Sequence, residues 1–243
     1  ADGRFVVFAS NADDLIVGDT NGVYDVFVRD VVSGVTERVS VSTLGVEADA
    51  ASERPDISLD GRYVVFESMA TNLVTTPDLN GFKDVYVHDR QTGQTRRVST
   101  TAAAVDADGA STDASISADG AVIAFKSEAK NLIANDQNGV ADVFVEDAAA
   151  GGITRVSVSS AGAEADGFSG QLYGVDVSGD GRFVAFASFA TNLVPGDLNA
   201  SSDIFVHDRL NSTTERVSVT NTGAEADWTS RSATISYDGN IVA

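Results

Sequence analysis

Residues 3–10 read GRFVVFAS, and this short apolar run recurs along the whole chain. Each recurrence follows an Asp-Gly pair, and the aspartates of these pairs are Asp2, Asp60, Asp119, Asp180 and Asp238. Their spacing of 58 to 61 residues indicates a repeat architecture. Each of the first four units continues with a polar loop, a second apolar run, a short turn and an alternating segment. The chain therefore contains four copies of one unit and the beginning of a fifth.

The runs predict β-strands. In residues 3–10 apolar side chains stand at odd and even positions alike, so a strand here is buried on both faces. Residues 24–29 begin in the same way, whereas residues 36–42 alternate and predict a half-exposed strand. β-Branched residues fill the runs and no 3.6-residue period persists, so helices are not expected.

A fourth run in each unit is short and rich in small side chains, at residues 55–58, 114–117, 175–178 and 233–236. Pro55 cannot donate a ladder hydrogen bond, which places this run at a sheet edge. Small side chains suit the crowded centre around which the sheets would be arranged. The predicted order across each sheet is therefore inner, middle, middle and outer strand.

Sheets whose middle strands are buried on both faces stack radially, as the blades of a β-propeller do. A two-sheet sandwich would leave one face of every sheet in water and is disfavoured. We predict an all-β chain of four-stranded antiparallel blades, forming a single propeller domain over residues 1–243. Its repeats begin near residues 2, 60, 119 and 180, with a partial fifth from 238.

Ring closure depends on how the two ends of the chain meet. If residues 233–236 supply the inner strand of the blade begun at Arg4, a four-bladed ring closes and residues 241–243 are left over. Residues 241–243 repeat the beginning of the first strand. This indicates either that the chain is a piece of a longer array or that two copies form a larger ring. We favour four blades within this chain.

The pattern DGRFVVFAS, then NLV, GD-x-N, D-[VI]-[FY]-V-x-D and T-x-RVS resembles the TolB-type propeller repeats, which are related to WD repeats. The resemblance covers the whole chain. It implies the fold more than a function. Propellers of this kind also occur as lids beside serine peptidase domains or carry glycan-cleaving sites.

Charge limits the partners. With 36 acidic and 16 basic residues the chain carries a formal charge of −20, which argues against nucleic acid and anionic membranes and favours cations. No apolar run approaches the ~20 residues that span a bilayer, so membrane insertion is not expected. The absence of cysteine excludes disulfides but does not identify a redox compartment.

The strongest candidate site is the polar loop between the two middle strands. Oxygen-rich loops of this kind suit Ca²⁺. The candidate ligands are Asp19, Asn21, Asp25, Asp78, Asn80, Asp84, Asp136, Asn138, Asp142, Asp197, Asn199 and Asp203. Turn chemistry explains the pattern equally well, because Asp and Asn accept backbone hydrogen bonds and the following Gly supplies a positive φ. Ala200 replaces that Gly, which makes a positive φ there less favourable, so the fourth loop is the expected exception if the loops bind metal.

Two further acidic patterns recur. Asp30, Asp89, Asp147 and Asp208 end the second apolar runs and are expected to cap the following turns. Acidic pairs precede the next inner strand at residues 47 and 49, 106 and 108, 164 and 166, and 225 and 227. We expect these pairs in solvated loops, with a second cation site or a contact with the neighbouring blade as alternatives.

No catalytic residues are expected. His88 and His207 occupy one equivalent strand position, and no nucleophile elbow, zinc-protease motif or P-loop interrupts the repeats. Residues 167–174 are the least regular stretch, and irregular loops on a rigid scaffold often bind ligands. Phe168, Tyr173 and Trp228 are therefore candidate ligand-binding residues, with packing between blades as the alternative.

These observations favour a non-catalytic binding or scaffold propeller that is exported to the periplasm or the cell exterior. Calcium in the Asp-x-Asn loops would stabilise it, because extracellular calcium is concentrated enough to fill weak sites. Its partner would be a protein or a glycan, or a second copy completing a larger ring. The rival hypotheses are an accessory domain of a larger hydrolase, such as a peptidase lid, and a glycan-binding adhesin.

Overall fold

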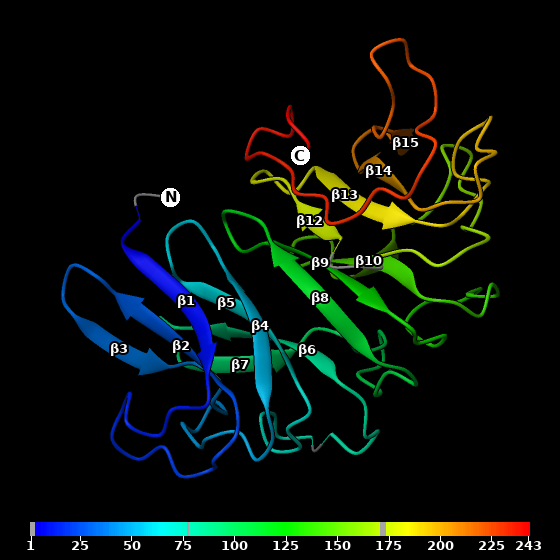
Figure 1. Ribbon diagram of the computed structural model, residues 1–243. Helices are drawn as coiled ribbons and strands as arrows, with labels where there is room; N and C mark the ends of the chain where they lie inside the picture. Colours follow the sequence, from blue (N-terminus) through cyan, green and yellow to red (C-terminus); the bar gives the residue numbers. More distant parts are fainter. Residues whose placement is uncertain (1–2, 77, 171–173) are drawn as a thin grey trace.

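The computed structural model describes residues 3–76, 78–170 and 174–243 (Figure 1). Within these ranges the secondary structure consists of β-strands without helices. The strands are β1 (Phe5–Ser10), β2 (Asp25–Asp30), β3 (Val35–Arg38), β4 (Ser52–Ile57), β5 (Tyr63–Ser68), β6 (Asp84–Asp89), β7 (Gln94–Arg97), β8 (Ser111–Ile116), β9 (Val122–Ser127), β10 (Asp142–Asp147), β11 (Gly152–Arg155), β12 (Val175–Val177), β13 (Phe183–Ser188), β14 (Asp203–Asp208) and β15 (Thr213–Arg216). The all-β prediction is confirmed, and among the described residues no helix could span a membrane.

The strands form four antiparallel sheets in which sequence neighbours pair. The orders are β1-β2-β3, β4-β5-β6-β7, β8-β9-β10-β11 and β12-β13-β14-β15. This confirms the predicted order from inner to outer strand. Pro55 lies in the edge strand β4, where the register with β5 shifts between Glu53 and Asp56. A missing N–H is tolerated at such an edge.

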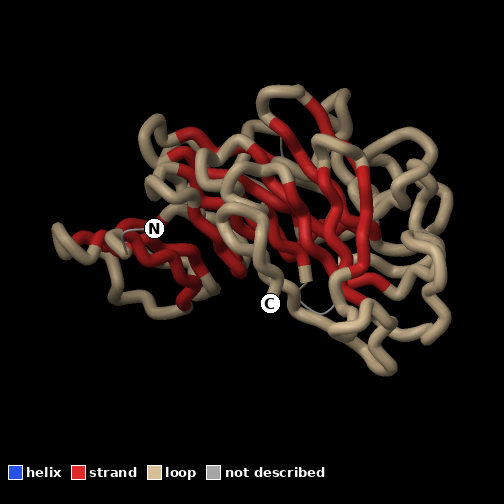
Figure 2. The backbone as a smooth tube through the Cα atoms, turned by 90° about the horizontal axis from the view of Figure 1, so that it is seen from above, coloured by secondary structure: helices blue, strands red, loops and turns tan. Residues whose placement is uncertain are grey.

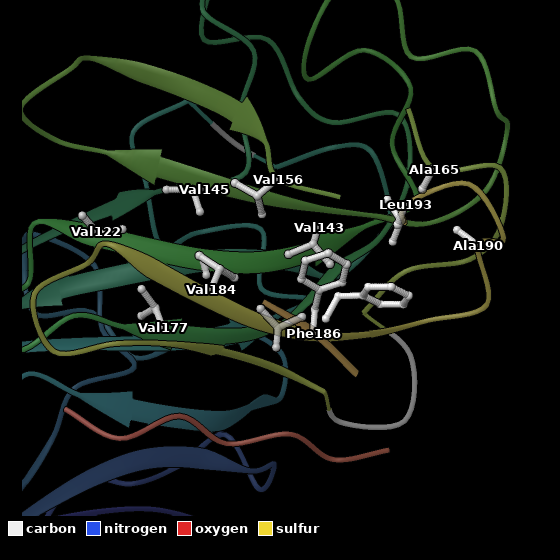
Figure 3. Close-up of a cluster of buried hydrophobic side chains, with 13 residues drawn as sticks. Val122, Val143, Val145, Val156, Ala165, Val177, Val184, Phe186, Ala190 and Leu193 are labelled. Atoms are coloured by element: carbon white, nitrogen blue, oxygen red, sulfur yellow. The ribbon is translucent and has the colours of Figure 1, made fainter. Parts of the chain in front are cut away.

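Apolar clusters fill the spaces between successive sheets, so the middle strands of the second, third and fourth sheets are buried on both faces. On β5, Val64 and Phe66 face the first sheet and Val65 faces the third. On β9, Ile123 faces the second sheet, while Ala124 belongs to the cluster shared with the fourth sheet. Figure 3 shows this last cluster, with Val143 and Val145 of the third sheet meeting Val184 and Phe186 of the fourth. This two-sided burial is the radial packing of a propeller.

Backbone hydrogen bonds join successive inner turns around the centre of the array. The N–H of Leu59 donates to the carbonyl of Ala118 at 2.9 Å, and Ala118 donates to Gly179 at 3.0 Å. Gly179 in turn donates to Tyr237 at 2.9 Å. These turns also line a shared central hollow with Phe5. Equivalent turns therefore make the same contacts from one sheet to the next, which keeps the spacing between successive sheets constant.

The first sheet differs from the other three because it has three strands, and β1 pairs with β2 alone. Closure of the ring through residues 233–236 was the wrong expectation. Those residues pair with residues 241–243: Thr234 and Ala243 exchange two hydrogen bonds of 3.0 Å, and Ile235 lies opposite Val242. Pairing across a tight turn costs little chain entropy, whereas reaching β1 requires closure of the entire ring. In Figure 2 the sheet that carries the N-terminus stands at one end of the array.

Candidate functional site

Each Asp-x-Asn loop closes a compact polar cluster at the start of the second middle strand. In the first sheet, Asn21 Nδ2 donates to Asp25 Oδ2 at 2.7 Å and to the Ala48 carbonyl at 3.0 Å. The Asn21 Oδ1 accepts the N–H of Val23. Because a carbonyl can only accept, the contact with Ala48 fixes which end of the amide faces Asp25. The asparagine therefore presents its NH₂ group to the carboxylate and acts as a bridge between loop and strand.

The same bridge recurs in the other three sheets. The Nδ2–Oδ2 distances are 2.9 Å for Asn80 and Asp84, 2.8 Å for Asn138 and Asp142, and 3.1 Å for Asn199 and Asp203. Ala200 reaches φ 52°, in the left-handed region that Gly22, Gly81 and Gly139 occupy. The fourth loop therefore keeps the shape of the others at the cost of a strained alanine.

The strand aspartate of each cluster is completely buried and also accepts a serine hydroxyl. Ser40 Oγ donates to Asp25 Oδ1 at 2.5 Å, and Ser99, Ser157 and Ser218 make the equivalent bonds in the other sheets. The serine belongs to the recurring Arg-Val-Ser at the end of the outer strand. Thus the loop, the middle strand and the outer strand meet at one carboxylate.

Sequence reasoning missed the arginine at the centre of each cluster. Arg38 Nη1 lies 3.1 Å from Asp19, 3.4 Å from Asp25 and 2.9 Å from Glu47. Arg97, Arg155 and Arg216 occupy the same position in the later sheets. The Arg-Val-Ser motif follows the strand aspartate at constant spacing, so the signal was present in the sequence. Its meaning depended on the alternation of the outer strand, which turns the arginine toward the loop.

The acidic pairs before the inner strands are also part of this architecture. Their first members are half-buried, whereas their second members are exposed, as the prediction of solvated loops requires. Their first members, Glu47, Asp106, Glu164 and Glu225, bind the cluster arginines. The second members reach the following sheet, where Asp49, Asp108 and Asp166 accept the N–H groups of Thr71, Lys130 and Thr191, each at 2.7 Å. Contact with the neighbouring blade, the alternative raised above, is confirmed. Each cluster consequently holds three carboxylates against one guanidinium.

The four clusters are not identical. In the second, Tyr86 Oη donates to Asp78 Oδ2 at 2.9 Å, whereas phenylalanine stands at this strand position in the other sheets. In the third and fourth clusters, the Oδ1 atoms of Asp136 and Asp197 are buried without a hydrogen-bond partner. The cluster arginines lie farther from these aspartates, at 3.7 and 3.6 Å.

Asp136 and Asp197, the loop aspartates that lack a hydrogen-bond donor, also have raised pKa values. Burial, reinforced by the nearby charges of Asp142 and Asp203, raises the pKa of Asp136 and of Asp197 to about 6. Backbone N–H donation from Leu198 lowers the pKa of Glu225. In the second cluster, burial raises the pKa of Asp84 to about 7. The clusters therefore favour any added positive charge, whether a proton or a cation.

Two of the clusters have the donor set of a hard-cation site. Carboxylate oxygens of Asp136, Asp142 and Glu164 lie within 4.8 Å of one another, as do those of Asp197, Asp203 and Glu225. Oxygen ligands of this kind suit Ca²⁺. The predicted asparagine ligands do not present their oxygens to these groups, and a glutamate absent from the predicted set completes each trio.

The strand-end aspartates and the histidines have structural roles. Asp30 Oδ1 accepts the N–H groups of Val32 and Ser33 at 2.9 and 3.2 Å, which confirms the predicted turn cap. Asp89, Asp147 and Asp208 cap their turns in the same way. His88 Nδ1 lies 2.8 Å from Thr95 Oγ1, and burial lowers the pKa of the ring. His207 repeats this arrangement with Thr214 at 2.9 Å.

Two of the three candidate aromatic residues are exposed, at different repeat positions. Phe168 is 46% exposed and Trp228 is 78% exposed, whereas Tyr173 lies outside the described residues. Trp228 stands where the second and third repeats have Gly109 and Gly167. A Cβ at those glycines would lie 2.7 or 2.8 Å from the backbone of the following sheet. A large side chain at residue 228 is possible because no described sheet packs there.

No protein-family model matches the sequence, and no curated protein matches it significantly. Similar folds occur among solved structures. A protein of Agrobacterium tumefaciens described as a TolB matches with 15% identity and a TM-score of 0.53, covering 88% of this chain and 61% of that one. The acylaminoacyl peptidase of Pyrococcus horikoshii matches with 13% identity and a TM-score of 0.52, covering 99% and 33%. The dipeptidyl peptidase 4 of Porphyromonas gingivalis matches with 14% identity and a TM-score of 0.52, covering 88% and 31%.

These likenesses agree with the fold built up from the residues, which is that of a TolB-type β-propeller. The chain spans 61% of the Agrobacterium protein and about a third of either peptidase. At identities of 13 to 15% the likeness concerns the fold alone.

Proposed function

We propose that this chain is a non-catalytic propeller module that presents exposed loops to a partner outside the cytoplasm. The supporting observation is that the buried ionisable groups described above recur at equivalent positions, where they join loops, strands and neighbouring sheets. Catalytic sites usually break a local pattern, and this chain uses its polar groups to maintain one. Its irregular features are instead the exposed aromatic residues, Phe168 and Trp228.

The fold is compatible with two settings for such a module. Peptidases with this kind of propeller support an accessory role beside a hydrolase domain, and the TolB likeness supports a periplasmic or extracellular location. We favour a binding role because exposed aromatic side chains give contact area at little entropic cost. The partner is a protein or a glycan.

The test combines turnover and binding measurements. The chain is incubated with a fluorophosphonate hydrolase probe and with peptide and glycoside substrates, and it is then applied to a glycan array. We expect no labelling, no turnover, and binding that falls at least tenfold in Trp228→Ala or Phe168→Ala. Val17→Ala serves as a control at an apolar residue that is fully exposed. Turnover of any substrate, or binding unaffected by both aromatic substitutions, would contradict the proposal.

A second proposal concerns the third and fourth clusters, which we propose bind Ca²⁺. The supporting observation is that Oδ1 of Asp136 and of Asp197 is buried beside two further carboxylates and accepts no hydrogen bond. A buried oxygen without a hydrogen-bond donor costs free energy that a cation would recover. In the second cluster, Tyr86 already satisfies Asp78, so that cluster has less to gain.

Thermal unfolding in EDTA and in excess Ca²⁺ tests this proposal. A single site with free ion at 100 times its Kd adds about 2.7 kcal/mol to the free energy of unfolding. We expect a calcium-dependent rise that disappears in the Asp136→Asn, Asp197→Asn double variant and persists in the matched Asp78→Asn variant. If Ca²⁺ leaves the midpoint of thermal unfolding of the wild-type chain unchanged, the clusters are ionic networks between loop and strand and do not bind the ion.

A further inference from the structure

One position of the repeat carries an arginine in the second and fourth sheets and an alanine in the third. Arg90 and Arg209 follow the strand-end aspartates of their sheets, and Ala148 stands at the same place in the third. The N–H of Arg90 donates to the Arg62 carbonyl at 2.9 Å. The N–H of Ala148 donates to the Ala121 carbonyl at the same distance. The third sheet therefore keeps the backbone and lacks the long side chain.

Arg90 occupies the space between the first and second sheets. Its guanidinium lies over the ring of Phe5, with Cζ 4.7 Å from the ring centroid. It also donates to the Gly61 carbonyl and pairs with the Glu37 carboxylate of the first sheet. The guanidinium thus contacts an aromatic face, a carbonyl acceptor and a negative charge at the same time.

Arg209 makes equivalent polar contacts between the third and fourth sheets. It donates to the Gly181 carbonyl at 2.5 Å and pairs with Asp147 of the third sheet at 2.6 Å. In both spaces, one guanidinium therefore binds a glycine carbonyl of its own sheet and a carboxylate of the sheet before it.

The space between the second and third sheets contains a groove of about 520 Å³, a volume typical of ligand sites. Ala148 and Gly120 of the third sheet line it together with Tyr63 of the second. A Cβ on Gly120 would lie 2.2 Å from the Tyr63 ring, and a Cβ on Gly61 would lie equally close to Phe5. Ring and glycine turn therefore meet here as they do in the space that Arg90 occupies.

The groups that would hold a guanidinium are available in this groove. Among the described residues, no side chain donates to the Gly120 carbonyl, unlike the carbonyls of Gly61 and Gly181. The Tyr63 ring contacts the guanidinium of Arg62 at 4.6 Å, whereas two guanidinium groups contact Phe5. The groove therefore offers both an acceptor and an aromatic surface.

The charges around the groove leave one carboxylate without a counter-charge. Asp89 accepts two hydrogen bonds from Arg62, at 2.9 and 2.7 Å. Arg96 pairs with Glu146 of the third sheet at 2.9 Å, which neutralises the arginine that would otherwise repel a cation. Asp119 also lines the groove and forms no ion pair with the described residues. The balance is one negative charge, which complements a single cation.

We propose that this groove receives an arginine side chain from a protein partner. Its guanidinium lies against the Tyr63 ring, donates to the Gly120 carbonyl and pairs with Asp119. The chain itself fills the equivalent spaces with Arg90 and Arg209. A planar guanidinium suits the groove better than an ammonium, because it stacks on aromatic rings and donates several hydrogen bonds in fixed directions.

This inference does not rest on the aromatic residues of the proposed function, because neither Phe168 nor Trp228 lines the groove. The glycan array and the hydrolase substrates test that function at the aromatic residues. The experiments on the groove use an arginine peptide, so the two proposals can fail separately.

Titration with a short peptide tests the groove in the unmodified chain. The probe is acetyl-Gly-Arg-Gly-amide in millimolar excess, at low ionic strength, followed by the amide chemical shifts of the isotope-labelled protein. We expect saturable shifts at Gly120, Ala121 and Ala148. The same peptide with citrulline, which resembles arginine without its charge, should bind at least tenfold more weakly. Equal binding of the two peptides, or no saturable shift at these residues, would overturn the proposal.

Ala148→Arg supplies the missing side chain from within the chain. We expect this variant to bind the arginine peptide at least tenfold more weakly and to unfold at a higher temperature, because residue 148 then makes the contacts of Arg90. Ala149→Arg adds the same charge at the next exposed residue of the turn and should still bind the peptide. Unchanged binding by Ala148→Arg would place the peptide elsewhere and refute the groove.

Asp119→Asn tests the charge with little effect on the turn. Asp119 Oδ1 accepts the Ser117 hydroxyl at 2.8 Å and the Ala121 N–H at 3.0 Å, and asparagine keeps this acceptor. We expect the affinity for the arginine peptide to fall at least fivefold and to depend less on salt. An affinity equal to that of the wild type would exclude Asp119 as the counter-charge and contradict the proposal.

Discussion

The second and third sheets each contain a buried cluster of carboxylates around an arginine, but the side chain next to the loop aspartate differs. Both hold three carboxylates and one arginine between a loop, a middle strand and an outer strand. In the second sheet the hydroxyl of Tyr86 satisfies the loop aspartate Asp78. In the third sheet Phe144 replaces the tyrosine, and Oδ1 of Asp136 is buried without a hydrogen-bond donor, 3.7 Å from Arg155 Nη1.

The comparison shows how little sequence change separates a loop aspartate that accepts a hydroxyl from one that lacks a hydrogen-bond donor. The rings of Tyr86 and Phe144 stack on Phe66 and Phe125 with the same centroid distance, 6.0 Å. The apolar role of the position is therefore unchanged. A single hydroxyl alters the polar side without disturbing the packing.

Removal of the arginine should produce the largest effect. In Arg97→Met the buried carboxylates of the second cluster lose their counter-charge, and breaking a buried pair in this way costs about 3–5 kcal/mol. Urea unfolding at neutral pH measures the loss. Arg96→Met is the matched control, because the Arg96 side chain is exposed and pairs with Glu146, and exposed pairs contribute about 1 kcal/mol or less. An equal decrease in the free energy of unfolding of the two variants would contradict the buried network.

Removing the Tyr86 hydroxyl from the second sheet, or adding one to Phe144 of the third, should have the next largest effect on the free energy of unfolding. Tyr86→Phe removes the donor to Asp78 and should lower the free energy of unfolding by about 1–3 kcal/mol, the cost of leaving a buried acceptor unsatisfied. Phe144→Tyr should add a donor beside Asp136 and raise stability by about 1 kcal/mol. Both are measured in EDTA. If both variants lose stability, the difference between the sheets does not arise from this hydroxyl.

The pH dependence should give the smallest effect. The pKa of Asp136 is raised to about 6 in the folded protein, against ~3.9 for an unperturbed aspartate. The folded state therefore binds more protons between these values. The contribution to stability is complete below pH ~4 and is lost as the pH rises through about 6.

Denaturant unfolding between pH 4 and pH 8 in EDTA measures this slope. Asp136→Asn keeps a neutral side chain at every pH, so the difference between variant and wild type should grow as the pH rises through about 6. Subtracting the two curves cancels the buried histidines, which act in the opposite direction because burial lowers their pKa. A difference independent of pH would show that Asp136 remains ionised throughout this range.

Sequence patterns predicted the local elements because their causes are local. The Asp-Gly turns, the two-sided apolar runs and the proline at residue 55 specify strands, turns and an inner edge. The caps at Asp30 and its equivalents were predictable for the same reason, since each contact spans two or three residues. Four repeats in register then required radial stacking.

The candidate site was predicted only in part. The aspartates of the Asp-x-Asn loops were identified, but the arginine at the centre and the glutamate from the next loop were not. Arg38 follows Asp25 by 13 residues and Glu47 follows Arg38 by nine, so their convergence depends on strand register and loop path. Amide orientation was equally inaccessible, because only the carbonyl of Ala48 determines which end of Asn21 faces the carboxylate.

By itself, the sequence determined the repeat, the strand character of its runs and the chemistry of its turns, because these depend on residues close together in the chain. The tertiary structure decided which carboxylates share an arginine and which of them lack a hydrogen-bond donor. Those outcomes depend on contacts between separate strands and sheets, where burial strengthens electrostatic interactions and makes each missing partner costly.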